Sequence, residues 1–533
     1  MARPASDPDT LPGGTVALPA LVKGRIVQAP DLSAGELDAL WDAGEQGQAA
    51  GSESARSFEH ATVIRHPVID QTTLVPTGES QYLVLPTVDP RELIENDPGE
   101  LARSLYSLPF REVLAYAEGL SRVLNDGNLL AHAARSAAAT SWLGGRFHER
   151  FFASLPGLFD RDGLGAAVDR GLATGDHPGS RYLDGWAEVS AAASPGPTAI
   201  AATQIGGYKP PLPRVPLTRA MPTRQLHITA GNAPIVPAIS FLRALSTKGA
   251  AVIKSPSGAT ATAAVLAHAM ARLDPDHPIT RHTSLVYWKG GERRVEDVLF
   301  APGNFDRLLV WGAADTMSSV TQRATDARQI LLRPRVGMSL IGHQVFADDV
   351  DNVAARAAVD VMVANQAGCT SSLVHYVEGS EVEVLEYCRA LQGALATWDR
   401  ALPHRLPPQA LGRLRRLKRG AFLRGTWFEN GRWPDITSAV VYLPNPFDLA
   451  AHPMSRCVVV RAVRQLADAV QFFQPGISTV GVYPEPVRVQ VRDELAARGV
   501  STILPLGDTE CAYIGMPHDG MHVLHELVNW VNS

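Results

Sequence analysis

Apolar and polar positions follow two rhythms along the chain. From Gln225 onwards, short apolar runs alternate with segments of helical periodicity, in the order QLHITAGNAP, IVPAISFLRALSTKG, AAVIKSPS, GATATAAVLAHAMARL and FDRLLVWGAA. Alternation of strand and helix is what a parallel, doubly wound sheet requires. A second region of this kind runs from about Gly337 to the end, where MHVLHELVNWV predicts a terminal helix. The pattern predicts an α/β protein with two doubly wound domains.

The chain before Gln225 follows other patterns. Between Thr62 and Pro86, β-branched residues alternate with polar and turn residues, which predicts short strands in a bridging or oligomerisation hairpin. Helical periodicity follows over 111–127 and 129–155. The first fifty or so residues are rich in Gly, Ala, Ser and Asp, and they predict a partly disordered arm that leads into a short helix at 32–47.

Composition and charge narrow the class of protein. The chain has 533 residues, 45% of them hydrophobic, which is enough for two or three domains with their own cores. The formal net charge of -5 leaves no overall basic field, so nucleic acid is not an expected partner. The segment MARPASDPDTLPGGT lacks the apolar region of a signal peptide, and no run approaches the roughly 18 apolar residues of a spanning helix. We expect a cytoplasmic protein without a membrane span.

The four cysteines are Cys369, Cys388, Cys457 and Cys511, and they form no CxxC pair. This spacing argues against a disulfide framework and against a structural zinc site, so no metal is expected. Cys388 lies at helical spacing, Cys457 lies in a strand pattern and Cys511 lacks a motif, so all three are interpreted as structural. Cys369 differs, because in NQAGCTSS a core segment opens into a Gly-containing turn. Such a position suits a nucleophile as well as a buried thiol, and a thiolate is intrinsically a strong nucleophile.

Four motifs occur in one order along the chain: TAGNAP, VIKSPS, VWGAADT and NQAGCTSS. This ordered set resembles the aldehyde dehydrogenase superfamily, and with the tail PHDGMHVLHELVNWV the chain is more similar to the fatty-acyl reductases of bacterial luminescence. Each motif is weak alone, so the specificity lies in the order, which spans roughly residues 56–530. The resemblance implies an aldehyde dehydrogenase-like fold with an N-terminal extension at 1–55, an NAD(P)-binding domain at 56–335 and a catalytic domain at 336–533. It also implies a homo-oligomer.

The resemblance identifies two residues with acyl chemistry. Cys369 matches the family nucleophile, and Asn232 matches the asparagine whose amide, together with the Cys369 backbone N–H, holds a developing oxyanion. The alternative for Asn232 is a turn residue before Pro234, and the alternative for Cys369 is a structural thiol. No histidine within several residues of Cys369 is placed to act as its base.

No GxGxxG fingerprint is present, so the cofactor residues rest on the resemblance. Lys254 matches the lysine that contacts the adenosine ribose, with a surface lysine as the alternative. Many NAD-preferring relatives have a glutamate three residues further on, where this chain has Ser257. Because a serine can donate to a 2'-phosphate that a carboxylate repels, NADPH is favoured, with NADH as the alternative. Gly312, with Ala313, matches the turn where a helix N-terminus meets the pyrophosphate.

The chain also departs from the superfamily. Aligning RPRVGMSLIG on the Glu-Leu-Gly-Gly stretch places Arg335 or Val336 where hydrolytic aldehyde dehydrogenases have the glutamate that activates water. Neither side chain can do this, as expected of an enzyme that protects a thioacyl intermediate. The Glu-x-Phe-Gly-Pro motif is missing around AAHPMSRCVVV. His518 and Asp519 belong to the tail signature, although Asp519 also suits the N-cap of the terminal helix.

A basic run lies between Arg413 and Arg424, RLRRLKRGAFLR, with six positive charges in twelve residues. It is either a solvated helix face or a docking patch for an acidic partner or for the phosphates of coenzyme A.

Together, these features predict an oxidoreductase that reduces an acyl thioester to an aldehyde with NADPH, through a thioacyl intermediate on Cys369. The acyl donor is acyl-CoA or an acyl carrier protein. The alternatives are an acylating aldehyde dehydrogenase working towards the thioester, an acyl-phosphate reductase and, from another class, a non-catalytic carrier-binding subunit. The sequence assigns neither the acyl chain nor the residue that acts as acid or base.

Overall fold

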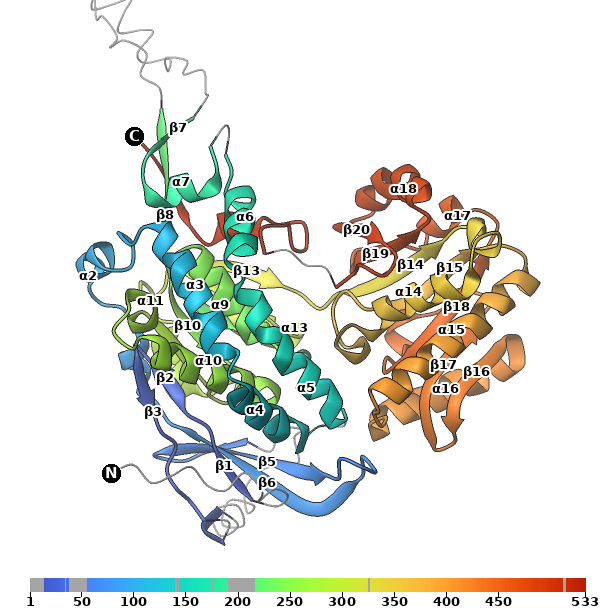
Figure 1. The fold of residues 1–533 in the computed structure, drawn as a ribbon, viewed down its shortest axis with the longest axis horizontal. Coiled ribbons are helices and arrows are strands. Elements are labelled where there is room, and N and C mark those ends of the chain that lie inside the picture. Colours follow the sequence, from blue (N-terminus) through green and yellow to red (C-terminus); the bar gives the residue numbers. More distant parts are fainter. Residues whose placement is uncertain are drawn as a thin grey trace, which may run out of the picture.

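Two α/β domains lie side by side in the computed structural model (Figure 1). The structure describes residues 14–33, 35–37, 55–139, 141, 143–174, 177–189, 216–324, 326–510 and 514–533. The first domain is built on a seven-stranded sheet from residues before 333, and the second on a seven-stranded sheet from residues 336–505. Both sheets are largely parallel, so the predicted α/β architecture is confirmed.

The first sheet carries helices on both faces. In sheet order its strands are β13 (Arg328–Leu332), β12 (Arg307–Trp311), β9 (Arg224–Ile228), β10 (Ala250–Lys254), β11 (Thr283–Val286), β2 (Ala20–Val22) and β3 (Arg25–Val27). Successive side chains of a strand point to opposite faces, so Ala251 and Ile253 of β10 enter one core and Val252 enters another. The first core is covered by α3 (Phe110–Leu124), α9 (Val236–Ser246) and α10 (Thr260–Leu273). The second is covered by α12 (Arg293–Leu299) and α13 (Ala314–Arg323).

The second sheet repeats this plan. In sheet order its strands are β16 (Thr426–Arg432), β17 (Asp435–Tyr442), β18 (Cys457–Val463), β15 (Ser372–Glu378), β14 (Val336–Ile341), β19 (Ile477–Tyr483) and β20 (Thr502–Pro505). One face packs on α14 (Val350–Met362) and α15 (Glu381–Ala401). The other packs on α16 (Pro408–Arg424), α17 (Leu466–Val470) and α18 (Glu485–Ala497). Only β16 is antiparallel to its neighbour among these strands.

The predicted strands between Thr62 and Pro86 are present as a hairpin of β5 (Ala61–Ile69) and β6 (Pro76–Pro86). With β1 (Thr15–Ala17) and β4 (Ala55–Ser57) they form a four-stranded sheet, and a bridging role for it stays a prediction. Part of the predicted N-terminal extension is therefore folded. Strands β1 to β3 lie within residues 15–27. The three apolar residues of β2 are buried, because this strand pairs with β11 in the first sheet. Residues 1–13 and most of the predicted helix at 32–47 lie outside the described residues.

The predicted terminal helix is wrong. Only α19 (Val523–Glu526) is helical, and the chain then forms β21 (Asn529–Asn532), which pairs with β8 (Leu217–Met221). Pairing with β8, itself paired with β7 (Ala187–Glu188), satisfies the backbone of a segment whose Trp and Val suit a strand. The final segment, 514–533, thus returns to the first domain (Figure 1). The predicted second domain instead covered the whole of 336–533.

No helix of the described ranges is long and apolar enough to cross a membrane. Within the same ranges, no cluster of three or more His, Cys, Asp or Glu side chains is arranged to hold a metal ion. Cys388 and Cys457 are buried in the second domain, and Cys511 lies outside the described residues.

Candidate active site

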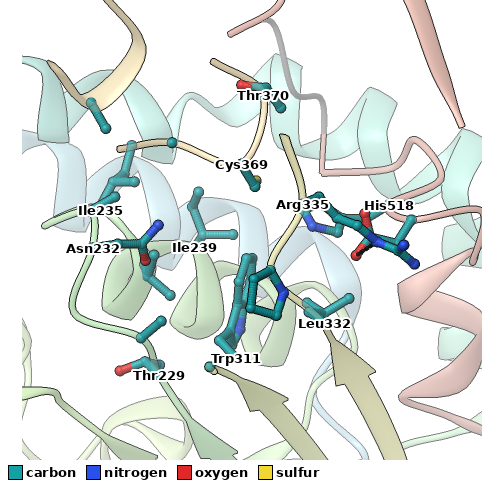
Figure 2. Close-up of a pocket in the computed structure, with 18 of the residues that line it drawn as sticks. Thr229, Asn232, Ile235, Ile239, Trp311, Leu332, Arg335, Cys369, Thr370 and His518 are labelled. Carbon is teal, nitrogen blue, oxygen red and sulfur yellow. Dashed lines mark ion pairs between the residues drawn. The ribbon is translucent and has the colours of Figure 1, made fainter. Parts of the chain in front are cut away.

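A cavity of about 1560 Å³ lies between the two domains. On the first domain it is lined by the carboxyl ends of β9, β10, β12 and β13, where parallel α/β sheets bind ligands. On the second domain it is lined by the amino ends of β19 and β20 and by the segment ahead of β15. Figure 2 shows side chains from both domains pointing into it.

The segment that carries Cys369 turns sharply between α14 and β15. Ala364, Asn365 and Gln366 all have positive φ angles of 45°, 55° and 64°, which are uncommon for residues with side chains. The buried Gln366 amide holds this turn in place. Its Nε2 donates to the carbonyls of Ser372, at 3.0 Å, and Cys457, at 2.6 Å, and its Oε1 accepts from the Cys457 N–H at 2.8 Å.

Cys369 lines the cavity and is partly exposed. Burial raises the pKa of its thiol, and the Asp519 carboxylate raises it further. The backbone N–H groups of Cys369 and Thr370 and the Arg243 guanidinium act in the opposite direction. At neutral pH the resting side chain is therefore a thiol, so a nucleophilic role requires a group that removes its proton.

Asn232 lies in the loop after β9 and reaches across to the second domain. Its Nδ2 donates to the Ala367 carbonyl at 2.9 Å, two residues ahead of Cys369. Figure 2 shows Asn232 and Cys369 on facing walls of the cavity. The structure thus brings the two predicted acyl-transfer residues together, while the oxyanion role of the amide stays a prediction.

Lys254 and Ser257 line the cavity at the end of β10. Lys254 is only 8% exposed, which excludes a surface lysine, and its Nζ lies 5.5 Å from the ring centre of Tyr287 and 5.7 Å from that of Trp288. Such aromatic faces stabilise a buried ammonium group. Ser257 begins a short 3-10 turn ahead of α10.

Gly312 and Ala313 form the turn between β12 and α13, and both line the cavity. Ala313 is the N-cap of α13, with an extended backbone (φ -67°, ψ 165°) and no side-chain hydrogen bond to the helix. The first N–H groups of an α-helix lack partners within the helix. The end of α13 is therefore suited to a bound phosphate.

The structure settles which residue after β13 faces the cavity. Arg335 lines it, whereas Val336 is the first residue of β14 and does not. The lining residues are Leu332, at the end of β13, and the three that follow it, Arg333, Pro334 and Arg335. None of the four is a carboxylate.

Asp519 has a different role from the predicted helix cap, because His522 occupies the N-cap position of α19. The Asp519 side chain is 7% exposed and its Oδ2 lies 3.7 Å from Arg335 Nε. Burial raises the pKa of this carboxyl group, although the guanidinium groups of Arg335 and Arg243 lower it. The neighbouring His518 ring packs edge-on against Trp311, with 5.3 Å between ring centres, and burial lowers its pKa to about 3.

Arg243 is a site residue that the sequence did not indicate. It is 4% exposed on α9, and its guanidinium carbon lies 4.8 Å from the Trp311 ring centre. Its Nε and Nη1 have no hydrogen-bond partner among the described residues. Burial lowers its pKa to about 10, while Asp519 and Cys369 act to raise it. One signal was available, because IVPAISFLRALS places a single arginine in an otherwise apolar helix.

The basic run lies on α16, which packs on the second sheet and contributes no residue to the cavity. Two apolar side chains near its end, Phe422 and Leu423, are 78% and 83% exposed. The docking interpretation stays a prediction.

Comparison with known proteins agrees with this geometry. Residues 217–530 match the acyl-CoA reductase (LuxC) family, which is more than half of the chain. The long-chain acyl-protein thioester reductase of Vibrio harveyi is 27% identical over 322 residues, covering 59% of this chain and 65% of the relative. The enzyme of the same name from Photorhabdus laumondii is 27% identical over 317 residues, covering 58% and 63%. The match spans less than two thirds of these relatives.

Solved structures share the fold over almost the whole chain. Aldehyde dehydrogenase 21 from Physcomitrella patens, in complex with succinate, superposes with a TM-score of 0.66 at 11% identity and covers 98% of both chains. Lactaldehyde dehydrogenase from Escherichia coli gives a TM-score of 0.63 at 14% identity, covering 97% of this chain and 98% of that one. Both likenesses confirm the aldehyde dehydrogenase-like fold. With its family match and this architecture, the chain belongs to the acyl-CoA reductase (LuxC) family.

Proposed function

We propose that this protein reduces an acyl thioester to an aldehyde with NADPH, through a thioacyl intermediate on Cys369. The observation that carries the proposal is that Asn232, whose amide donates to the Ala367 carbonyl on the turn that carries Cys369, lines the same cavity as Cys369, and that no carboxylate is among the residues that follow β13. The printed names of the relatives, long-chain acyl-protein thioester reductases, support the same substrate class. The acyl donor is an acylated carrier protein or acyl-CoA.

Cys369, Asn232 and Arg335 each have a separate role in the proposed reaction. The Cys369 sulfur attacks the thioester carbonyl, and the carrier leaves as a thiol. The Asn232 amide and the Cys369 N–H hold the negative charge that develops on the carbonyl oxygen. Because the positively charged Arg335 stands near the position of a hydrolytic base, the thioacyl group persists until it is reduced.

The cavity fits a dinucleotide on the first domain. Lys254 and Ser257 at the end of β10 would hold the adenosine ribose and its 2'-phosphate, and the N-terminus of α13 at Gly312 and Ala313 would hold the pyrophosphate. NADPH, when bound, supplies the hydride. Ser257 supports NADPH over NADH because it presents no negative charge.

Intact-protein mass spectrometry tests the function. The wild type and Cys369→Ala are incubated with a medium-chain acyl-CoA, first without cofactor and then with NADPH. We expect an acyl adduct on the wild type alone, which disappears on addition of NADPH as the aldehyde forms. Rapid loss of the adduct in buffer without NADPH would instead show a thioesterase, and no adduct with acyl-CoA or, in a parallel incubation, with an acylated carrier protein would rule the proposal out.

A further inference from the structure

Arg335 and Cys369 are held next to each other by the second sheet. Strands β14 and β15 are parallel neighbours, and the Gly337 N–H donates to the Ser371 carbonyl at 2.9 Å. Arg335 and Cys369 each lie two residues ahead of these partners. Gly337 permits the close approach, because a Cβ there would lie 2.3 Å from the Thr370 carbonyl oxygen. Both residues therefore line the same wall of the cavity, each just ahead of one of two neighbouring strands.

The final segment, 514–533, places the Asp519 carboxylate at the same cavity wall. The backbone groups of His518 and Met521 bond each other at 2.8 and 3.0 Å, which closes a tight turn around Asp519. Asp519 adopts φ 51°, in the left-handed region that Asp and Asn tolerate best after glycine. Figure 2 shows Arg335 and His518 together beside Cys369. The Asp519 carboxylate is thereby fixed 3.7 Å from Arg335 and lines the cavity.

The titratable groups around Asp519 come from several segments of the chain. The two charged groups are Arg335, which precedes β14, and Arg243, on α9. Cys369 precedes β15, and the neutral His518 is the neighbour of Asp519 in the turn. A buried carboxylate is retained here between two guanidinium groups, one of which keeps unsatisfied Nε and Nη1 donors. Clusters of this kind, in which burial and charge partners oppose each other, concentrate at functional sites.

We propose that Asp519 is the acid–base residue of the acyl-transfer step, with Arg335 as the residue that positions it. The inference rests on the proposed function. The Asp519 carboxylate takes the proton of the Cys369 thiol as the sulfur bonds to the thioester carbon. The carbonyl carbon then releases the carrier sulfur, which receives this proton from Asp519 and departs as a thiol. The proton is conserved, and no redox partner takes part in this half of the reaction.

The need for such a residue follows from the resting thiol. A cysteine paired with a protonated histidine is already a thiolate, but here burial and the Asp519 charge raise the pKa of Cys369. Proton removal must therefore accompany the attack. Asp519 lines the cavity beside Arg335 and its charge acts on Cys369, whereas Asp160, which also lines the cavity, is engaged as the N-cap of α6 (Arg161–Gly171).

The test compares two reactions of Cys369 in Asp519→Asn, which keeps the shape and tolerates the left-handed backbone. The first reaction is alkylation by iodoacetamide across a pH series, which reports the thiol pKa. The second is acylation by acyl-CoA, followed by rapid quench and intact mass. Asp160→Asn is the matched control, since asparagine is as good an N-cap as aspartate.

We expect the two reactions to change in opposite directions. Removing the Asp519 charge shifts the alkylation midpoint to lower pH, so alkylation at pH 7 becomes faster. Acylation becomes slower by about a hundredfold, because the base is lost. Asp160→Asn leaves the alkylation profile unchanged. If acylation is not slowed, or if both reactions slow together, Asp519 is not the acid–base residue.

Arg335→Gln gives an independent test that does not depend on the folding of the Asp519 variant. Arg335 lowers the pKa of Asp519, so its removal raises that pKa further, and the acidic limb of the acylation–pH profile should move to higher pH. An unmoved limb would overturn the inference. Failure of the wild type to form any adduct would instead overturn the proposed function itself.

Discussion

The Asn232 amide donates to the carbonyl of Ala367 on the turn that carries Cys369. The same group is proposed to hold the oxyanion that forms when the proposed nucleophile, Cys369, attacks the thioester. Asn232→Ala should slow acylation by about a hundredfold or more, which is the usual effect of losing one such donor. Time-resolved intact mass measures the adduct.

Alkylation by iodoacetamide serves as the control for Asn232→Ala, since it needs no oxyanion. An alkylation rate within about twofold of the wild type would show that the thiol itself is intact. Acylation at the wild-type rate would contradict the oxyanion role.

Ser257 is the residue proposed to set the preference for NADPH over NADH. Ser257→Glu places a carboxylate where the 2'-phosphate is proposed to bind, so affinity for NADPH should fall at least about tenfold while affinity for NADH is kept or rises. Fluorescence titration of the protein with each nucleotide gives both dissociation constants. Ser257→Ala removes the hydroxyl without adding charge and should lower NADPH affinity less. An equal loss of affinity for NADPH and NADH would show that Ser257 does not contact the 2'-phosphate.

The residues found from sequence share one property. Asn232, Lys254 and Gly312 lie at or shortly after the carboxyl ends of β9, β10 and β12, which meet at one edge of the first sheet, and Cys369 lies shortly ahead of β15, so local pattern is enough to place them near strand ends. Arg243 and Asp519 could not be placed in this way. Their relation to Cys369 depends on contacts between segments more than a hundred residues apart along the chain.

At the scale of elements, Asp360 of α14 ties that helix to the turn after β20. The side chain is fully buried and accepts from the Gly507 N–H at 2.9 Å, the Thr509 N–H at 3.1 Å and the Thr509 hydroxyl at 2.9 Å. Burial nevertheless raises the pKa of this carboxyl group to about 6. The protonated form is therefore favoured by the folded state.

This shift predicts how stability depends on pH. The contribution of Asp360 is fully present below the unfolded pKa of about 4 and is lost as pH rises through 6, a change of roughly 2 to 3 kcal/mol. The melting temperature of the wild type relative to Asp360→Asn, which does not titrate, should fall between pH 4.5 and pH 7. Asp351→Asn, an exposed change on the same helix, is the control. A constant difference across this range would contradict the shifted pKa.

The elements themselves were largely predictable, and the two exceptions have different physical causes. Strongly periodic segments such as 225–310 formed the predicted strands and helices, because their apolar faces specify burial locally. The tail MHVLHELVNWV did not, since its last residues gain more from pairing with β8 than from helical hydrogen bonds. Strand β2 was also missed, because three apolar residues within a polar arm give too short a pattern.

At the scale of the whole molecule, Arg307 fastens the tail to the first domain. Its Nε donates to the Glu526 carbonyl at 2.6 Å and its Nη2 to the Val528 carbonyl at 2.9 Å. Arg307 lies on β12, so the tail is held on the sheet that forms one side of the cavity. Since the tail also carries Asp519, the two hydrogen bonds from Arg307 should affect the reactions of Cys369, although Arg307 itself does not line the cavity.

Arg307→Ala should release β21 and allow Asp519 to leave its place beside Arg335. We expect faster hydrogen–deuterium exchange of the β21 amides, slower acylation, and an alkylation midpoint at lower pH, as in Asp519→Asn. Arg328→Ala is the matched control, because Arg328 also pairs with Glu526 but its side chain is 60% exposed. Faster exchange of β21 without any change at Cys369 would show that the Arg307 hydrogen bonds and the catalytic centre are independent.

The return of the tail also makes the second domain an insertion within the first. Residues 336–510 leave the host domain after β13, and the chain rejoins it at 514–533. In recombination between family members, such an insert is exchanged as one module with two junctions. The module would carry Cys369, the proposed nucleophile, whereas Asn232, Arg243 and Asp519 would remain with the host. A chimera would thus combine a proposed catalytic centre from two parents, with Cys369 from one and Asn232, Arg243 and Asp519 from the other. Side chains that fit each other across the cavity stay matched only when both domains come from the same parent.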